Sequence, residues 1–229
     1  TQKWHCWVSN QGGHKLYQLF KKLKATKEQF DELTDIVGGF KSLSSNREKV
    51  KKNIVRLPKE FKPLWSNGGS IIGKHSRAYL YNRKISNADI IRYGIGYCEE
   101  GVYANRIIIP SYSSDGELNY FVGRDIYEGG FKYKNPPVSK DVIGFDLFIN
   151  WNEPIILCEG VFDAIAIKRN AIPLFGKTIP KSLKKKIYEK KVKEIYILLD
   201  RDAISDAIRI TDDLMKNGIN VYFVGLSEE

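Results

Sequence analysis

Strand-like and helix-like segments alternate regularly through the last third of the sequence. The expected strands are short apolar runs at 154–158, 172–175, 194–199 and 220–224, and the expected helices are stretches at about 161–169, 181–192 and 205–216. Short apolar runs rich in β-branched residues are typical of parallel strands that are buried on both faces. Because helices separate these runs, this region is predicted to form a parallel sheet covered by helices.

Acidic residues follow two of these expected strands directly. Glu159 and Asp163 come after the first strand, and Asp200 and Asp202 come after the third. The carboxyl ends of parallel strands lie at one edge of a sheet, so the two acidic clusters should meet there if their strands are neighbours. Converging carboxylates repel one another unless a cation lies between them, and an oxygen-seeking ion such as Mg²⁺ fits this pattern. The alternative is that each acid only caps the helix that follows it, which the helix dipole favours.

Composition indicates a folded and basic protein. Of the 229 residues, 42% are hydrophobic and 12% are aromatic, which is typical of a globular chain. Lys and Arg number 37 against 27 for Asp and Glu, giving a net charge of +10 and a pI near 9.3. This charge favours a polyanionic partner, with nucleic acid the first expectation and an anionic membrane surface the second. The three well-separated cysteines imply no disulfide framework, and no apolar run approaches the length of a membrane span, so the chain is predicted to be soluble and cytoplasmic.

Three regions are expected along the chain. Residues 1–66 carry two amphipathic helices, at about 16–24 and 27–37, followed by a polar linker. Residues 67–150 open with a helix pair and continue with two strands joined by a turn. Residues 151–229 hold the predicted parallel sheet. The sequence does not begin with Met and ends soon after an expected strand, so we expect a fragment of a longer protein.

Basic side chains recur among aromatic ones in the middle region. The cations are Arg106, Arg124, Lys132 and Lys134, and the aromatic residues between them are Tyr103, Tyr120, Phe131 and Tyr133. Cations bind phosphates, and exposed aromatic rings can stack on bases. The alternative is an ordinary strand pattern, with the cations in solvent and the rings in the core. A lysine-rich helix at 181–193 allows two similar interpretations, a solvated face or a surface that attracts a nucleic-acid backbone.

The beginning of the chain is similar to half of a zinc ribbon. His5 and Cys6 precede a glycine turn that is followed by His14. Ser9 stands where a second thiolate is expected, and a hydroxyl is a poor zinc ligand. Without an upstream pair of ligands these side chains cannot close a structural site, so zinc binding is not expected.

Taken in order, these residues resemble bacterial-type DNA primases, particularly the phage members, over nearly the whole chain. Residues 5–13 are similar to the end of the primase zinc ribbon, 77–97 to the helical entry of the RNA polymerase domain, 105–110, 123–124 and 132–136 to the basic signatures of that domain, and 159–163 with 200–202 to the first two motifs of the Toprim fold. The resemblance implies an α/β fold, in which an α+β N-terminal lobe precedes a Toprim-like parallel sheet flanked by helices.

The same resemblance implies an activity, the synthesis of short RNA primers on single-stranded DNA by a metal-dependent nucleotidyltransferase. It implies that Glu159, Asp200 and Asp202 hold Mg²⁺ or Mn²⁺ with support from Asp163. Residues implied to contact the triphosphate or the template are Arg106, Arg124 and Lys132, with Lys134 and Lys177 as weaker candidates. The implied partners are a single-stranded DNA template, nucleoside triphosphates, an RNA primer and, in the full-length protein, a replicative helicase. The implied setting is the bacterial cytoplasm, including that of a phage-infected cell.

The sequence departs from the primase pattern in two places. Ser9 and the missing upstream ligands remove the expected zinc site, and a further acidic motif that should follow the last strand lies beyond the end of the sequence. Two rival functions would use the same fold: a Toprim nuclease or topoisomerase, and a non-catalytic module that binds single-stranded DNA during replication. A topoisomerase needs a tyrosine nucleophile in a separate domain, and nothing in the sequence marks one of the 13 tyrosines for that role.

Overall fold

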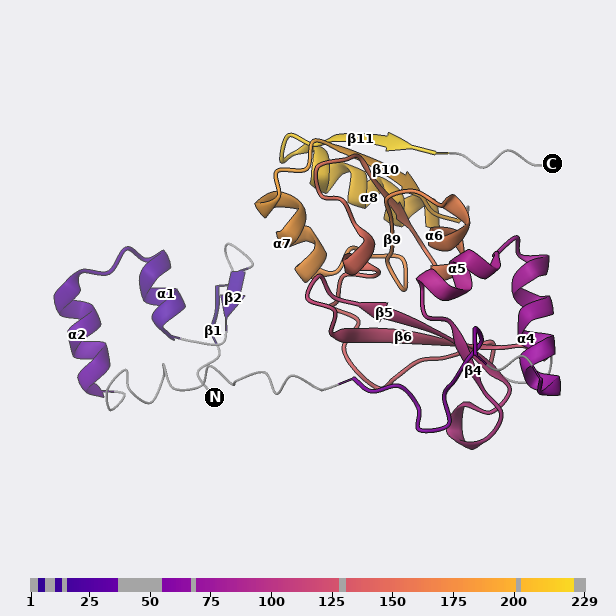
Figure 1. Ribbon diagram of the computed structural model, residues 1–229. Helices are drawn as coiled ribbons and strands as arrows, with labels where there is room; N and C mark the ends of the chain where they lie inside the picture. Colours follow the sequence, from indigo (N-terminus) through magenta and orange to yellow (C-terminus); the bar gives the residue numbers. More distant parts are fainter. Residues whose placement is uncertain are drawn as a thin grey trace. The chain divides into compact units, whose positions relative to one another are not determined.

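The computed structural model describes residues 4–6, 11–13, 16–36, 55–66, 69–127, 131–200 and 203–224 (Figure 1). The chain divides into two compact units, Thr1–Asn53 and Ile54–Glu229. The first boundary expected from the sequence was residue 66, whereas the structure places it near residue 53. The reason is that strand β3 (Lys62–Pro63) pairs with a strand of the second unit.

The first unit contains a short hairpin and two helices. Strand β1 (Trp4–Cys6) pairs antiparallel with β2 (Gln11–Gly13), and helices α1 (Leu16–Lys22) and α2 (Lys27–Ile36) follow as predicted. The Thr26 backbone N–H donates to Gln29 Oε1 at 2.9 Å, which satisfies one backbone group at the start of α2. The polar linker lies outside the described residues, as do His14 and the side chains of His5 and Cys6, so the expected absence of zinc stays a prediction.

The second unit begins with a five-stranded antiparallel sheet. Its order is β3, β4 (Gly96–Cys98), β5 (Arg106–Tyr112), β6 (Leu118–Asp125) and β7 (Tyr133–Lys134). Two helices, α4 (Ile71–Asn82) and α5 (Asn87–Arg92), precede β4, and short 3₁₀ turns occur at Gly101–Tyr103 (η1) and Asp146–Phe148 (η2). Ser70 Oγ accepts the Gly73 N–H at the start of α4, and Ser86 with Asp89 forms a capping box at the start of α5. The predicted helix pair and the predicted hairpin of two strands are both present.

A four-stranded parallel sheet completes this unit, as the alternating pattern predicted. Its order is β11 (Asn220–Phe223), β10 (Glu194–Leu198), β8 (Ile155–Cys158) and β9 (Ala171–Pro173). Helix α6 (Val161–Ile167) connects β8 to β9, α7 (Lys181–Glu189) connects β9 to β10, and α8 (Ile204–Met215) connects β10 to β11. Strands β8 and β10 are therefore neighbours although a whole strand and two helices separate them in the sequence.

Helix α6 joins the two sheets into one core. Its Phe162 and Ile165 are buried in the cluster that also contains Leu80 of α4, Ile90 of α5 and Ile107 of β5. Helices α7 and α8 pack on the other face of the parallel sheet, where a second cluster forms. Each fully buried side chain of this kind contributes about 1.5–3 kcal/mol. The regions predicted as separate, 67–150 and 151–229, thus share a hydrophobic core.

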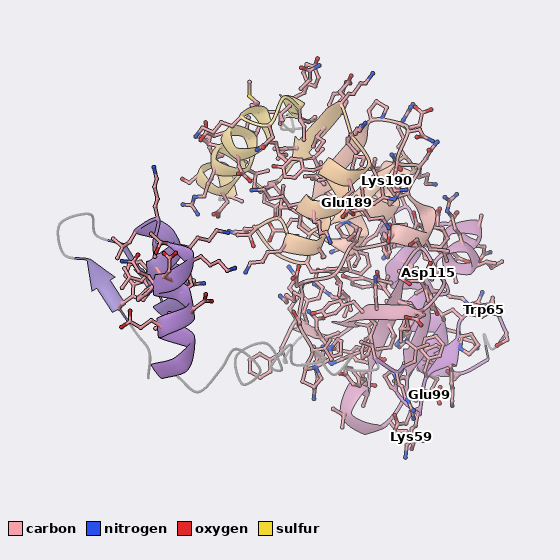
Figure 2. All side chains as sticks on the ribbon, turned by 90° about the vertical axis from the view of Figure 1, so that its left-hand side faces the viewer. Lys59, Trp65, Glu99, Asp115, Glu189 and Lys190 are labelled. Carbon is pink, nitrogen blue, oxygen red and sulfur yellow. The ribbon has the colours of Figure 1, made fainter. Side chains whose placement is uncertain are left out.

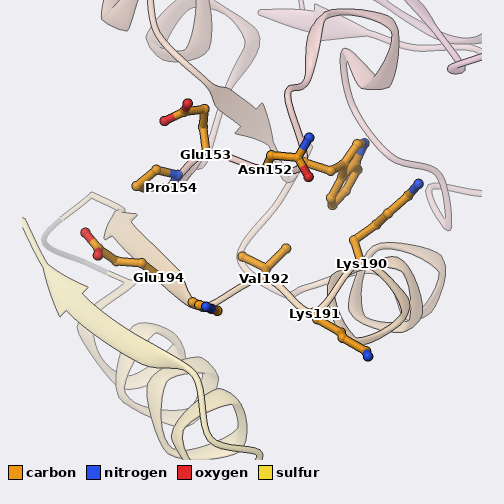
Figure 3. Close-up of a pocket in the computed structure, with 9 residues that line it drawn as sticks. Asn152, Glu153, Pro154, Lys190, Lys191, Val192 and Glu194 are labelled. Carbon is orange, nitrogen blue, oxygen red and sulfur yellow. The ribbon is translucent and has the colours of Figure 1, made fainter.

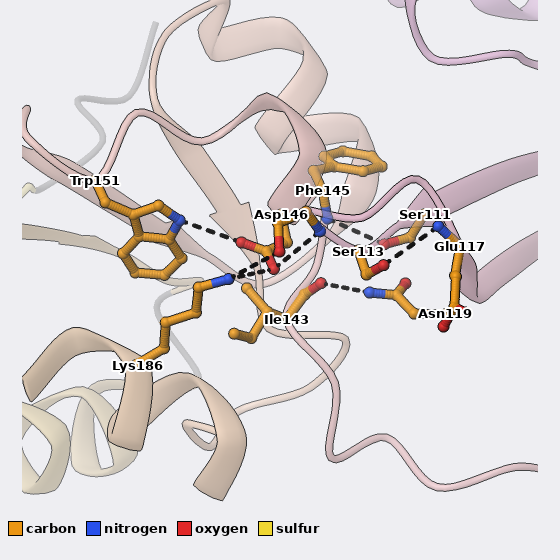
Figure 4. A network of polar contacts seen from close by, with 10 residues as sticks. Ser111, Ser113, Glu117, Asn119, Ile143, Phe145, Asp146, Trp151 and Lys186 are labelled. Atoms are coloured by element: carbon orange, nitrogen blue, oxygen red, sulfur yellow. Dashed lines mark hydrogen bonds and ion pairs between the residues drawn. The ribbon is translucent and has the colours of Figure 1, made fainter. Parts of the chain in front are cut away.

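A buried polar network also links the two sheets (Figure 4). Asp146, only 6% exposed, accepts hydrogen bonds from the Ser114 N–H and from Trp151 Nε1, both at 3.2 Å, and pairs with Lys186 Nζ of α7 at 2.7 Å. Lys186 belongs to the lysine-rich helix whose side chains were expected in solvent or near nucleic acid. Its side chain is 20% exposed, because the β5–β6 turn and η2 bring the carboxylate of Asp146 against α7.

The described helices include none that is both long enough and apolar enough to cross a lipid bilayer.

Candidate active site

Three of the four predicted acids, Glu159, Asp163 and Asp200, lie at the carboxyl edge of the parallel sheet. Cys158 pairs with Leu198 across β8 and β10, so Glu159 and Asp200 leave two neighbouring strands at almost the same level. Asp163 stands in the first turn of α6, which starts at this edge. Asp202, the fourth predicted acid, lies outside the described residues.

Burial and the neighbouring Asp200 both affect the pKa of Asp163. Its pKa is raised above the ordinary aspartate value, first because protein atoms displace water around the carboxyl group, and further because Asp200 carries a charge of the same sign. The Gly160 N–H donates to Asp163 Oδ2 at 3.1 Å and opposes this rise. Asp163 therefore caps the start of α6, as expected if this acid serves the helix that follows the strand. Asp200 has no such role, because α8 begins after Ala203 without a side-chain cap.

The donor set suits a hard divalent ion. Carboxylate oxygens are the side-chain ligands that Mg²⁺ prefers, and a cation near Asp163 and Asp200 would relieve their repulsion. Across the ranges that the structure describes, no three side chains of His, Cys, Asp or Glu form a closed metal cluster. An open site fits these residues better, since Mg²⁺ commonly keeps several waters and uses one or two carboxylates together with phosphates.

Two arginines and two tyrosines form a row beside these acids. The guanidinium carbon of Arg83, which caps the end of α4, lies 5.1 Å from the centroid of the Tyr79 ring, and Arg83 Nε donates to the Tyr79 hydroxyl at 2.9 Å. The Arg124 guanidinium lies 5.5 Å from the Tyr79 ring and 5.0 Å from the Tyr133 ring. We call Arg83, Tyr79, Arg124 and Tyr133 the arginine–tyrosine row. Rings, rather than carboxylates, hold both guanidinium groups in place.

The arginine–tyrosine row contacts the helix that carries Asp163. The Arg83 guanidinium carbon also lies 4.8 Å from the centroid of the Phe162 ring of α6, and its positive charge offsets a small part of the rise in the pKa of Asp163. In the described part of the chain, neither Arg83 nor Arg124 forms an ion pair with a carboxylate within 4 Å. Guanidinium N–H groups that ring stacking does not consume can bind an anion such as phosphate.

The pleat of the antiparallel sheet separates the basic residues that the sequence grouped together. Arg124 pairs with Ile107 and Tyr133, and its side chain lies on the face covered by α4. Arg106 and Lys134 belong to the alternate positions, which point to the opposite face. The resemblance implied that Arg106, and more weakly Lys134, contact the triphosphate or the template together with Arg124. The two-residue period of the strands places them on the face opposite to Arg124, so the three side chains do not share one surface.

Arg106 has a different set of partners. It is 8% exposed, its Nη2 pairs with Asp125 Oδ2 at 2.9 Å, and its Nη1 donates to the Phe131 carbonyl at 2.9 Å. Lys134 Nζ lies 5.8 Å from the centroid of the Tyr103 ring on the same face. Lys132 is exposed. For Arg106, these contacts favour a structural role over contact with a phosphate.

Lys177 follows β9 at the same sheet edge as the acids. Pro173 pairs with Cys158, so the loop after β9 starts beside Glu159. The loop is held by Lys140 Nζ, which donates to the Phe175 carbonyl at 3.0 Å. Lys177 itself is partly buried. Its backbone position is therefore at the edge of the site, and its role in binding stays a prediction.

Arg83 and Tyr79 were not among the predicted site residues. They lie four positions apart on α4, a spacing that places them on the same side of a helix, and this is the signal that could have paired them. No local sequence pattern connects these two residues to Asp163, because their proximity depends on packing between α4 and α6.

A pocket of about 350 Å³ lies at the opposite edge of the parallel sheet (Figure 3). Its lining comes from Trp151 to Pro154, before β8, and from Lys190 to Glu194, before and at the start of β10. It holds lysines and glutamates together, and it is separated from the acids by the length of the strands. It is therefore not part of the candidate active site.

Comparison with known proteins identifies the fold. No family model matches the sequence. The uncharacterized protein MG010 of Mycoplasma genitalium is 33% identical over 142 residues, which cover 56% of this chain and 64% of that protein. The matching part of this chain thus spans slightly less than two thirds of the length of this relative.

Solved structures are more informative. The zinc-binding and RNA polymerase domains of the Aquifex aeolicus primase match 99% of this chain and 68% of that chain, with a TM-score of 0.62 at 21% identity. The RNA polymerase domain of the Mycobacterium tuberculosis primase DnaG matches 71% of this chain and 72% of that one, with a TM-score of 0.58 at 16% identity. A DnaG primase catalytic domain bound to single-stranded DNA matches 70% of this chain and 68% of that chain, with a TM-score of 0.56 at 16% identity.

This chain has the fold of the bacterial primase catalytic core. In this primase fold, the antiparallel sheet supplies Arg124 and Tyr133, the helix pair supplies Arg83 and Tyr79, and the parallel sheet supplies the acids. The expected α/β fold, with an α+β lobe before a helix-flanked parallel sheet, is confirmed.

We expect Asp163→Asn to raise the melting temperature at pH 7. A carboxyl group whose pKa is higher in the folded than in the unfolded chain contributes stability only at low pH, and this contribution is lost as the pH rises through the folded pKa. At neutral pH the charge on Asp163 is therefore unfavourable, and Asn removes it while keeping an oxygen for the Gly160 N–H. The rise should stay below about 4 °C, the shift that roughly 1 kcal/mol causes in a domain of this size, because solvent screens part of the charge.

Thermal melts at pH 7 and pH 4 test this expectation. The difference between the two proteins should shrink at the lower pH. Asp115→Asn, in the exposed β5–β6 turn (Figure 2), is the control and should change neither melt. A lower melting temperature for Asp163→Asn at pH 7 would contradict the electrostatic account.

Proposed function

We propose that this chain is the catalytic part of a DNA primase, a metal-dependent nucleotidyltransferase that makes short RNA primers on single-stranded DNA. In this reaction a primer 3′-hydroxyl attacks the α-phosphate of a nucleoside triphosphate and pyrophosphate leaves. The observation that carries the proposal is that Glu159 and Asp200 follow neighbouring strands directly, while Asp163 lies in the first turn of α6 next to Arg83 of the arginine–tyrosine row. The primase fold supports it.

In this proposal the acidic residues bind the metal ion and the arginines bind the triphosphate. Glu159, Asp200 and Asp202 would hold Mg²⁺ or Mn²⁺ with support from Asp163, and the bound ion would neutralise phosphate charge and favour the attacking oxygen. The guanidinium groups of the arginine–tyrosine row would orient the triphosphate. Phosphoryl transfer needs little covalent chemistry from a protein, so positioning and charge neutralisation account for most of the catalysis.

Lysines outside this centre are candidates for contact with the nucleic acid. Lys177, at the edge of the site, and Lys132, on the exposed end of the antiparallel sheet, are candidates for the template or the primer. The net charge of +10 favours a polyanion, and a DnaG catalytic domain of the same fold binds single-stranded DNA. A replicative helicase would be a further partner in a longer protein.

The decisive experiment measures incorporation of labelled ribonucleotides on a single-stranded DNA template with Mg²⁺ or Mn²⁺. The assay uses the protein in its full natural length, because the resemblance expects one more acidic motif after the last strand. Metal-dependent products of a few nucleotides support the proposal. Cleavage of the template indicates a nuclease, and salt-sensitive DNA binding without incorporation indicates a non-catalytic module; either result contradicts the proposal.

The two faces of the antiparallel sheet provide a matched pair of variants. We expect Arg124→Met to lower kcat/KM for the nucleoside triphosphate about 10- to 100-fold, the effect of losing hydrogen bonds to a charged group. Lys134→Met, in the strand next to Arg124 but on the opposite face, should change it less than about threefold. Circular dichroism and thermal melts check that both variants fold. Equal effects of the two substitutions would show that the sheet faces do not separate the roles of these residues.

A further inference from the structure

The connection between β6 and β7 presents the ring of Phe131 to solvent on an anchored backbone. Phe131 is 87% exposed, the largest exposure among the large hydrophobic side chains of the described residues. Its carbonyl oxygen accepts a hydrogen bond at 2.9 Å from Nη1 of Arg106, a side chain that is itself almost completely buried. The backbone of Phe131 is thus tied to the sheet, while its ring has no place in the core.

Asp125 holds both ends of this connection. It pairs with Arg106 at 2.9 Å, its Oδ1 accepts the Tyr127 N–H at 3.1 Å, and its own N–H donates to the Lys132 carbonyl at 3.1 Å. The Tyr127 hydroxyl is in turn 2.7 Å from Nδ1 of His75 on α4. Burying the Arg106–Asp125 pair carries a desolvation cost, which its hydrogen bonds to the Phe131 carbonyl and from the Tyr127 N–H offset in part. These bonds tie both ends of the connection to the sheet.

Cations and another exposed ring follow Phe131 directly in the sequence. Lys132 follows Phe131 directly, and Tyr133, which is 44% exposed, lies 5.0 Å from the Arg124 guanidinium. A single exposed apolar side chain is common and has no meaning by itself. An alternation of exposed rings and cations is typical of surfaces that bind single-stranded nucleic acid, where the rings stack on bases and the cations follow the phosphates. An apolar protein partner would be expected to meet fewer cations.

We propose that Phe131 stacks on a base of the single-stranded template and that the Arg106–Asp125 pair positions it. This inference rests on the proposed function and extends the nucleic-acid path beyond the arginine–tyrosine row. It gives a positioning role to Arg106, for which the resemblance implied direct contact with the triphosphate or the template. The ring recognises the face of a base and not its edge, so no base preference is expected at this contact.

Binding of a fluorescently labelled oligothymidine, measured by anisotropy at several salt concentrations, tests the proposal. Phe131→Ala should weaken binding about tenfold or more at every salt concentration, because stacking is lost without a change in the number of phosphate contacts. Phe131→Trp should bind the oligonucleotide about as tightly as the unsubstituted protein does, because the indole ring can also stack on a base. Ile208→Ala, at an exposed apolar position on α8, is the matched control and should bind as the unsubstituted protein does.

Two further variants separate stacking from charge and from simple damage to the fold. Lys132→Met should reduce the slope of log K against log salt by about one, which Phe131→Ala should not do. Arg106→Lys should weaken binding in the unsubstituted protein and have no further effect once Phe131 is alanine, whereas a merely structural role would weaken both. The additional indole emission of the Phe131→Trp variant, taken as the difference from the unsubstituted protein, should be quenched by the oligonucleotide.

The proposal is overturned if Phe131→Ala binds the oligonucleotide as well as the unsubstituted protein does, the result also expected if the ring serves a protein partner. Failure of the proposed function has a different outcome. In that case the unsubstituted protein binds the oligonucleotide and loses affinity with Phe131→Ala, but it incorporates no ribonucleotide.

Discussion

Replacing Asp200 by Asn, alone or together with Asp202→Asn, should reduce metal-dependent ribonucleotide incorporation at least about 100-fold. An amide removes the negative charge that attracts the cation, and the stabilisation that a bound metal gives a phosphoryl-transfer transition state amounts to several kcal/mol. Binding of single-stranded DNA should survive, since it depends on cations and aromatic rings elsewhere in the fold. Incorporation and anisotropy measured on the same preparations check both halves of this prediction.

Asp212→Asn is the matched control for this loss. Asp212 is an exposed residue of α8 that pairs with Lys216 of the same helix, so its substitution removes one negative charge from the segment after β10 without approaching the sheet edge. It should leave incorporation unchanged. Activity of Asp200→Asn equal to that of the control would refute the metal site, whatever the fold.

Lys186→Met should be the most destabilising of the lysine substitutions on α7. It leaves the carboxylate of Asp146, whose side chain is 5% exposed, without its cation, and removing one partner of a buried pair costs about 3 kcal/mol or more. In a domain of this size that corresponds to a fall of roughly 10 °C in melting temperature. Trp151 and the Ser114 N–H continue to donate to Asp146, but neither carries a charge.

Lys185→Met provides the control on the same helix. Lys185 pairs with Glu189 at 3.5 Å, and both side chains are mostly exposed, at 76% and 58%, so this pair contributes less than about 1 kcal/mol. Thermal melts of the two variants should differ clearly. Adding Asp146→Asn to Lys186→Met should recover part of the loss, because the uncompensated charge is removed; no recovery would show that the lost packing of Lys186, and not its charge, matters.

Both variants concern residues of one lysine-rich run, and no local pattern distinguishes them. A run of lysines around two apolar positions is the pattern of a solvated helix face. Lys186 differs from Lys185 only because η2 and the β5–β6 turn, more than 30 residues away in the sequence, carry Asp146 to that point of the helix. Such a contact has no local signature.

The acids illustrate the opposite case. Glu159 and Asp200 could be assigned to one edge because each follows an apolar run, and strand direction is uniform in a parallel sheet. Whether they would be neighbours depended on strand order, which the alternation of elements does not specify. The order places β8 beside β10, and the two acids consequently leave adjacent strands.

For the basic residues, the sequence predicted the elements on which they lie, but only the tertiary structure decided which of them share a surface. Local patterns were sufficient for the helices, the strands and the edge on which the acids lie, because periodicity and strand ends depend on residues that are close in sequence. The face on which Arg124, Arg106 and Lys134 lie required the pairing register of β5, β6 and β7, since a shift by one residue reverses every side chain. The row that joins Arg83 to Arg124 through Tyr79 required α4 to pack against both α6 and the antiparallel sheet, and that packing is a property of the whole core.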